Sequence, residues 1–385
     1  MTYASRTKHA VVPYDAGDKS AVREFQREYF GAGSRQCNDA FADWLFERNP
    51  HRYRDQPVVW VCKRDGIVIG QQAAVPVVLK VGNDEYRASW GIDLMVQREW
   101  RLKGVAPALS AAYEGSADIL LGLGMSAAAV RAYSRAGWTD MGRLPFFVRP
   151  LDAGACAQAL QRGAGLASVL PDLLVAGSAR VMAGISRRIS RCSLEPVLAF
   201  DDRADAAWAA AAVDYPVLVK RDFTSLRWRF DQFPEPARYR RYYLMCRSQV
   251  IGYAVMRSDT WRGHKIARLV DYLAPRRHLG ALFALVVDQG RTTGAVAVFI
   301  EQLHLDATGL LKTLGCFRVG AATQFMLKAQ AAAIGFSGVL NQSGAWLVTR
   351  GDSDSDIPAD EAGAARPQAA IAQLSVRPVP GPWNA

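Results

Sequence analysis

The first 150 residues alternate between two spacings of hydrophobic positions, one typical of helices and one typical of strands. Apolar residues recur every three or four positions in the segments that we expect to be helical, at 19–30, 39–47, 105–113 and 127–136. Short apolar or alternating runs predict strands at 58–63, 67–77, 89–96, 118–123 and 144–148. This order of elements predicts an α/β fold.

The chain also contains an internal repeat. A Trp-x-Phe-acid-x-x-Pro motif begins at Trp44 and returns at Trp228. Three further matches follow in the same order, and they pair Cys62 with Cys246, Asp93 with Asp271, and Gly137 with Gly315. The separation between the copies changes only from 184 to 178 residues along the chain. Four matches in one order predict a duplicated domain.

The length of 385 residues suits two domains of roughly 150 residues each. We expect an N-terminal domain over 1–150, a helical connector over 151–195, a C-terminal domain over 196–345 and a mostly disordered tail over 346–385. The connector carries apolar residues at helical spacing and ends on basic residues. It can pack on both domains, or residues 151–192 can make a weak contact with a membrane surface.

Composition narrows the classes of partner. The net charge of +11 favours an anionic partner, such as nucleotide phosphates, an anionic glycan or lipid headgroups. The chain lacks a zinc-finger pattern, an RNP-like motif and a long basic run, so we expect no nucleic-acid partner. Six cysteines stand singly without a CxxC pair, which predicts neither a metal site nor disulfides. With no signal peptide or apolar run of about 20 residues, we expect a cytoplasmic protein.

One loop carries a pattern that suits phosphate binding. Between the strand at 89–96 and the helix at 105–113, the chain reads Arg101-x-x-Gly104-x-Ala106. Backbone N–H groups and the positive end of the helix dipole converge at such a junction, where a pyrophosphate fits. Gly104 lets the backbone approach the phosphates without a Cβ in the way.

This loop resembles the acetyl-CoA motif of the GNAT acyltransferase superfamily, Arg/Gln-x-x-Gly-x-Gly/Ala. A second segment, Ser126-x-x-Ala-x-x-x-Tyr133-x-x-x-Gly-Trp138, resembles the superfamily's Asn-x-x-Ala-x-x-x-Tyr-x-x-x-Gly-Phe element, with Ser126 and Trp138 as departures. The resemblance covers about residues 40–145, and 220–325 through the repeat. It implies two tandem GNAT-like α/β domains, each with a mixed, mostly antiparallel sheet flanked by helices.

The resemblance also implies site residues. An acyl-CoA would be held by Leu94, Met95, Val96, Arg101, Leu102, Lys103, Gly104, Val105, Ala106 and Ser126. Asp93 would act as base or orient a water, and Tyr133 would protonate the departing thiolate, although both positions also suit structural residues. The loop at 275–280 shows no cradle, so the second copy looks degenerate for CoA. Its candidates for acceptor binding are Asp271, Arg229 and His304.

The function that follows is a CoA-dependent N-acyltransferase with acetyl-CoA as donor and no metal. The expected acceptor is a small polar amine, which can be anionic, such as an amino sugar destined for a surface glycan. Tandem proteins associated with polysaccharide biosynthesis look most similar, and Fem-type transferases look more distant. The alternatives are a Fem-like transferase acting on a cell-wall or lipid precursor, and a non-catalytic module that senses CoA.

Overall fold

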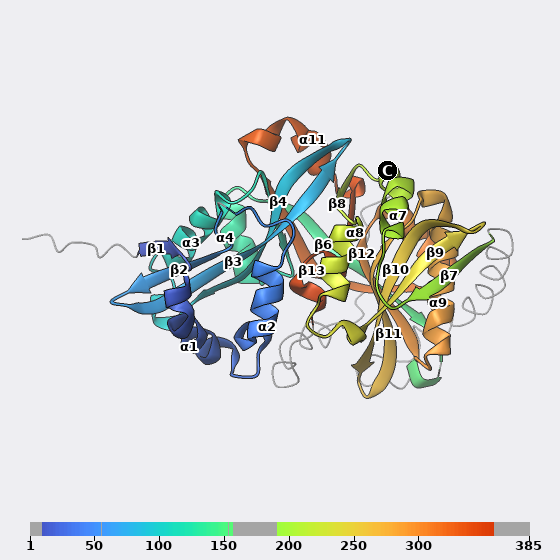
Figure 1. Ribbon diagram of the computed structural model, residues 1–385, viewed down its shortest axis with the longest axis horizontal. Coiled ribbons are helices and arrows are strands. Elements are labelled where there is room, and N and C mark those ends of the chain that lie inside the picture. Colours follow the sequence, from blue (N-terminus) through green and yellow to red (C-terminus); the bar gives the residue numbers. More distant parts are fainter. Residues whose placement is uncertain (1–9, 55, 153, 157–190, 358–385) are drawn as a thin grey trace, which may run out of the picture.

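The computed structural model describes residues 10–54, 56–152, 154–156 and 191–357 (Figure 1). Its strands are β1 (Ala10–Pro13), β2 (Val59–Arg64), β3 (Ile67–Val81), β4 (Asp84–Val96), β5 (Ile119–Leu123), β6 (Thr139–Pro150), β7 (Cys192–Val197), β8 (Val217–Val219), β9 (Tyr239–Cys246), β10 (Gln249–Trp261), β11 (His264–Leu273), β12 (Ala297–Leu303), β13 (Phe317–Ala329) and β14 (Trp346–Thr349). The α-helices are α1 (Lys19–Phe30), α2 (Asp39–Ala42), α3 (Val105–Glu114), α4 (Ala127–Arg135), α7 (Arg203–Ala211), α8 (Phe223–Leu226), α9 (Leu279–Thr292), α10 (Leu305–Thr313) and α11 (Ser337–Leu340).

The strands join into one mixed sheet that runs through both halves of the chain. Its order is β1-β2-β3-β4-β5-β13-β6-β12-β11-β10-β9-β7. The pairs β4–β5, β11–β12 and β8–β14 are parallel, and the remaining pairs are antiparallel. This arrangement confirms the predicted fold class, a mixed and mostly antiparallel sheet flanked by helices (Figure 1).

Helices cover the first half of the sheet on both faces. The apolar positions of α1, Val22 and Phe25, pack on Met95 and its neighbours from one face. From the other face, α3 and α4 bury Leu109 and Tyr133 against the same strands. Because side chains alternate between the two faces of a strand, neighbouring residues of β4 pack against helices on opposite faces of the sheet.

The two halves exchange one strand each. β13, from the second half, lies between β5 and β6, and β6, from the first half, lies between β13 and β12. Each exchanged strand therefore completes the sheet of the other half. The expected boundary at residue 150 coincides with the end of β6, a strand that pairs with β12 across the two halves.

The first part of the expected disordered tail is ordered. Residues 346–349 form the buried strand β14, and the short 3-10 turns η12 (Arg350–Asp352) and η13 (Asp354–Asp356) follow it. The prediction of disorder is wrong here, because this apolar strand pairs with β12 and β8. Most of the connector, residues 157–190, lies outside the described residues, so its packing and membrane contact stay predictions. Within the described part, no helix is both long and apolar enough to cross a membrane.

Candidate functional site

In the first half of the sheet, the neighbouring strands β4 and β5 diverge and leave an opening between them. These strands pair only where Ala88–Trp90 lie beside Ile119–Leu121, although both strands continue further. At the far end of β4, the Gln97 N–H donates to Ile69 O of β3 at 3.0 Å. Because successive backbone groups face opposite edges of a strand, the Val96 amide faces the edge from which β5 has diverged.

A β-bulge interrupts β4 beside this opening. Ile92 lies opposite Ala73 and Met95 lies opposite Gln71, so Asp93 and Leu94 together face Gln72. Asp93 has a φ of 51°, in the left-handed region. A bulge of this kind bends the strand and turns its side chains. The Met95 side chain points to α1, while Leu94 and Val96 pack with α3.

The predicted phosphate cradle lies directly at the start of α3. Gly104 precedes this helix with a φ of 86°, and a Cβ on it would meet no atom within 4 Å, so the cradle is open to solvent. The Lys103 Nζ and the Arg64 guanidinium lie 4.8 Å and 4.5 Å from the centre of the Trp100 ring. Cations and free helix N–H groups at one place suit a pyrophosphate.

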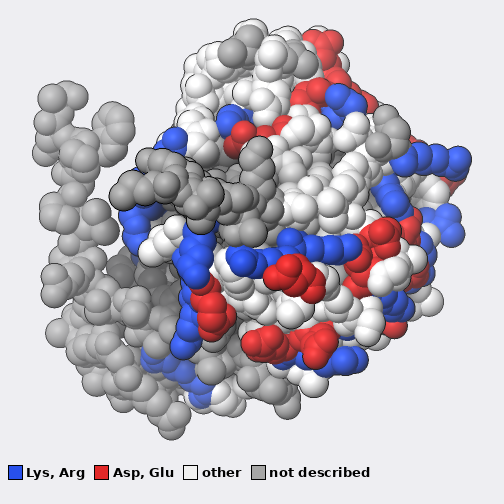
Figure 2. Space-filling model, turned by 90° about the vertical axis from the view of Figure 1, so that its left-hand side faces the viewer, with Lys and Arg blue, Asp and Glu red and all other residues white. Residues whose placement is uncertain are grey.

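The predicted CoA residues divide between this surface and the interior. Four are exposed in the cradle: Arg101, Leu102, Lys103 and Gly104. Val105 and Met95 are buried, so they could contribute only backbone groups. Ser126 caps α4, where its Oγ accepts from Ala129 N at 3.2 Å. On the face of the molecule seen in Figure 2, basic side chains are interspersed with acidic ones.

Tyr133 lies on the same face of the sheet as α3. Its hydroxyl donates to Gln72 Oε1 at 3.2 Å, and Gln72 Nε2 donates to the Ile92 carbonyl at 3.0 Å, beside the bulge. Burial raises the pKa of Tyr133 to about 12. The hydroxyl therefore keeps its proton at neutral pH, as a proton donor must. The sequence pattern had not indicated the contribution of Gln72.

Asp93 belongs to a cluster that the sequence did not predict. Its Oδ1 accepts from Gln36 Nε2 at 3.1 Å and lies 3.9 Å from Arg35 Nη2. Arg35 also forms an ion pair with Asp354, which comes from the C-terminal segment. Burial raises the pKa of Asp93, Arg35 lowers it, and Asp354 raises it further. These groups come from three distant parts of the chain, so no local motif could have indicated them.

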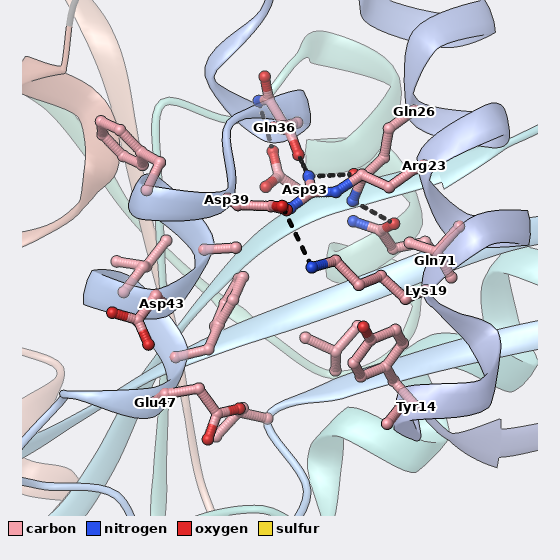
Figure 3. Close-up of a pocket in the computed structure, with 18 of the residues that line it drawn as sticks. Tyr14, Lys19, Arg23, Gln26, Gln36, Asp39, Asp43, Glu47, Gln71 and Asp93 are labelled. Carbon is pink, nitrogen blue, oxygen red and sulfur yellow. Dashed lines mark hydrogen bonds and ion pairs between the residues drawn. The ribbon is translucent and has the colours of Figure 1, made fainter.

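A cavity of about 530 Å³ opens beside this cluster (Figure 3). Figure 3 shows Gln36, Asp93 and Arg23 at one end, and Glu47 and Tyr14 at the other. Both signs of charge line the cavity, with the acids Asp15, Asp39, Asp43, Glu47 and Asp93 and the bases Lys19, Arg23, Arg35 and Arg52. Such a lining suits a small polar molecule that carries an amine.

The equivalent opening of the second half is filled. β11 and β12 pair only over Ala267–Leu269 and Val298–Ile300, and beyond these residues β14 pairs with β12. Asp271 there is buried and bonds Arg221 Nε at 3.2 Å and Thr349 Oγ1 at 2.8 Å. A cavity lined by Arg221, Asp271 and Asp352 measures about 30 Å³, which is room for a water molecule.

Arg229 and His304 also lie in the interior. The Arg229 guanidinium donates to Gly351 O and Ser353 O, at 2.9 Å each. Burial lowers the pKa of His304 to about 4, and its ring centre lies 5.0 Å from that of Tyr215. None of Arg229, His304 and Asp271 lines the 530 Å³ cavity, so their binding of the acceptor stays a prediction.

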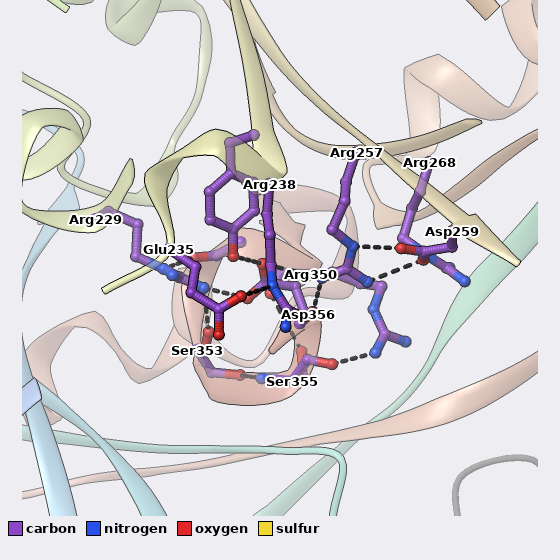
Figure 4. A network of polar contacts seen from close by, with 12 residues as sticks. Arg229, Glu235, Arg238, Arg257, Asp259, Arg268, Arg350, Ser353, Ser355 and Asp356 are labelled. Atoms are coloured by element: carbon purple, nitrogen blue, oxygen red, sulfur yellow. Dashed lines mark hydrogen bonds and ion pairs between the residues drawn. The ribbon is translucent and has the colours of Figure 1, made fainter. Parts of the chain in front are cut away.

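A polar network holds the C-terminal segment to the rest of the second half (Figure 4). Arg350 Nη1 pairs with Glu301 at 2.7 Å, and Tyr239 donates to Asp356 at 2.6 Å, while Arg229 forms an ion pair with the same carboxylate. This network fixes the turn that carries Asp354 to Arg35 of the first half.

Comparison with known proteins bears on the fold. No family model matches the chain, and none of the curated proteins is similar to it in sequence. Among solved structures, a GCN5-related N-acetyltransferase from Anabaena variabilis is 14% identical, with 84% of this chain and 73% of that chain covered and a TM-score of 0.58. One from Kribbella flavida is 13% identical, with 84% and 72% covered and a TM-score of 0.54.

A third similar structure is Saccharomyces cerevisiae N-myristoyltransferase with bound myristoyl-CoA. It is 12% identical, with 85% of this chain and 83% of that chain covered and a TM-score of 0.53. The glycine cradle lies in the N-terminal half, where the resemblance of sequence had indicated it, beside the divergent strands and the bulge that the structure adds. The chain thus has the fold of the GCN5-related N-acetyltransferases, which confirms the predicted resemblance to the GNAT superfamily at the level of the fold.

Proposed function

We propose that the protein is a CoA-dependent N-acyltransferase whose site lies in the first half. The observation that carries this proposal is the opening between β4 and β5 with the Gly104 cradle at its edge. The second half has the same divergence of strands, but β14 occupies it. An acyl-CoA would thus have one open place, with its pyrophosphate at the start of α3.

The residues around the opening supply the chemistry of acyl transfer. The Val96 amide faces the opening, where it can donate to the thioester oxygen as negative charge develops there. The ammonium loses one proton to solvent, and Asp93 accepts a second, directly or through a water, as the nitrogen forms its bond to the acyl carbon. As the carbon–sulfur bond breaks, Tyr133 donates its proton to the sulfur, and solvent then takes the proton from Asp93 and returns one to Tyr133.

The acceptor in this proposal is a small polar amine held in the 530 Å³ cavity. Asp39 forms an ion pair with Lys19, and Glu47 forms one with Arg52. An acceptor that carries both an ammonium and an anionic group could exchange with these pairs. An amino sugar on the way to a surface glycan carries such groups, and it is the acceptor that we propose. The proposed donor is acetyl-CoA, and the proposed location is the cytoplasm. A Fem-like transferase and a module that only senses CoA are the alternatives.

Two measurements test the proposal. Thermal unfolding with CoA, acetyl-CoA and longer acyl-CoAs should show stabilisation that grows with ligand concentration and is lost in Gly104→Glu. A thiol-release assay with acetyl-CoA should then be run over amino sugars, nucleotide-sugars, polyamines and amino acids. Stabilisation without thiol release for any amine would favour the CoA-sensing module. The absence of stabilisation by any acyl-CoA would overturn the proposed function.

A further inference from the structure

The second half carries three metal-binding side chains where the first half carries its phosphate cradle. The short turn η9 (Arg276–His278) leads into α9, and His278 stands just before that helix, as the cradle loop stands before α3. Beside it, Cys192 of β7 and Cys246 of β9 lie directly opposite each other in the antiparallel register. The sulfur and nitrogen atoms of these three residues all lie within 4.8 Å of one another.

The distances suit a small thiophilic cation. With metal–sulfur bonds of about 2.3 Å and metal–nitrogen bonds of about 2.0 Å, neighbouring ligand atoms of a tetrahedral zinc site lie about 3.5–3.8 Å apart. The Cys192 Sγ and His278 Nδ1 atoms are 3.8 Å apart. Small side-chain rotations would therefore bring all three atoms to bonding distance. We propose that Cys192, Cys246 and His278 form a zinc site.

The surroundings of the cluster allow an ion to enter. Cys192 is buried, but Cys246 and His278 are partly exposed, so the site is open on one side. The positive end of α9 favours the two thiolates that zinc binding requires. Among the described residues, no fourth His, Cys, Asp or Glu joins the group, so the fourth position is left to water or a small thiol.

One contact must change when the ion binds. The exposed Arg277 donates from Nε to His278 Nε2 at 3.2 Å, which requires Nε2 to be without a proton. Zinc on Nδ1 would place the remaining ring proton on Nε2, so Arg277 must turn away. Removal of this side chain should therefore leave zinc affinity unchanged or increase it, whereas loss of any of the three ligands should decrease it.

Such an ion would act as a structural link. It would fasten β7, the last strand at this edge of the sheet, to β9 and to the start of α9. This inference does not rest on the proposed acyl transfer, because the cluster lies in the half whose opening is filled by β14.

The test uses the full-length reduced protein, stripped of metal with a chelator. Titration with Co²⁺ should give the visible bands of tetrahedral cobalt and a thiolate-to-metal charge-transfer band at one ion per chain, and Zn²⁺ should displace them. Cys192→Ser, Cys246→Ser and His278→Ala should each weaken Zn²⁺ binding by more than about 10-fold. Cys37→Ser, a partly exposed cysteine outside the cluster, should bind as the unaltered protein does.

Two results would overturn the proposal of a zinc site. One is the absence of a charge-transfer band in a protein whose circular dichroism shows it to be folded. The other is an equal loss of affinity in Cys37→Ser, which would mean that cobalt binds to thiols without selection. If mild oxidation with glutathione disulfide instead links Cys192 to Cys246 in a protein that takes up no Zn²⁺, the pair is a redox pair and the metal site is rejected.

Discussion

Trp44 and Trp228 each donate a hydrogen bond to the backbone of the other. The Trp44 Nε1 atom lies 2.7 Å from Trp228 O, and the Trp228 Nε1 atom lies 2.9 Å from Trp44 O. Their rings stack with centres 5.3 Å apart and planes at 19°. The two residues occupy the same position in the two copies of the sequence repeat. A reciprocal contact between equivalent residues is what a two-fold relation between the copies produces.

This contact predicts a measurable cost for its loss. Trp44→Phe keeps an aromatic ring but leaves the buried Trp228 carbonyl without its donor, which should lower the free energy of unfolding by about 1–3 kcal/mol. Urea unfolding followed by circular dichroism measures the loss. Because the halves share one sheet, we expect a single transition. The partly buried Trp208 has no such role, and Trp208→Phe should cost less than about 0.5 kcal/mol. Equal costs for the two variants would contradict the prediction.

The sequence predicted the duplication but not the exchange of strands. The match of Gly137 with Gly315 makes β6 and β13, which follow these glycines, equivalent segments, and the apolar pattern predicted a strand at 144–148. Neither property determines which strand β6 or β13 pairs with, because β5 and β12 offer similar edges. A chain that ended near Arg149 would leave β5 without its partner β13, so we expect it to fold poorly.

The candidate site could be located from the sequence only where its residues are contiguous. The proposed cradle from Arg101 to Ala106 is contiguous in sequence, and Gly104 supplies the left-handed backbone that precedes α3. The groups around Asp93 are different, because Arg35 and Asp354 are 319 residues apart and meet only through the folded C-terminal segment. For the same reason, no local pattern indicated that β14 would fill the second opening.

The cradle gives a prediction about donor binding. Gly104→Glu should abolish binding of acyl-CoA, because an anionic side chain would occupy the place of the pyrophosphate. Isothermal titration with acetyl-CoA measures the effect. Gly82, in the turn between β3 and β4, also has a positive φ, of 63°, and a Cβ on it would likewise meet no atom within 4 Å. Gly82→Glu therefore carries similar backbone strain and should bind CoA normally. Loss of binding in both variants would reject the cradle.

Tyr133 can be tested against a second buried tyrosine on the same face. Tyr133→Phe should lower kcat by about 100-fold or more and leave the KM for the donor little changed, because only the proton donor is removed. Tyr113 donates to Ser89 O at 2.7 Å, and Tyr113→Phe should affect stability more than kcat. An unchanged kcat in Tyr133→Phe would make Tyr133 a packing residue whose hydroxyl only binds Gln72.

The cluster around Asp93 predicts how activity depends on pH. A general base must be ionised, so kcat/KM should rise with pH through the pKa of Asp93, which burial raises above its usual value. Arg35→Gln removes a cation that lowers this pKa and should move the acid limb of the profile to higher pH. Asp354→Asn removes a carboxylate that raises it and should move the limb to lower pH.

Shifts of the acid limb in opposite directions in these two variants would show that Asp93 is a base and not a structural carboxylate. If Asp93 only anchors Arg35 and Gln36, both substitutions can reduce activity by disturbing the loop, but neither will displace the acid limb. Asp65→Asn, in the exposed turn between β2 and β3, serves as the control and should leave the whole profile in place. Asp93→Asn should lower kcat/KM by about 10²- to 10⁴-fold and abolish the acid limb. Retention of the limb in Asp93→Asn would assign the base to another group of the cavity.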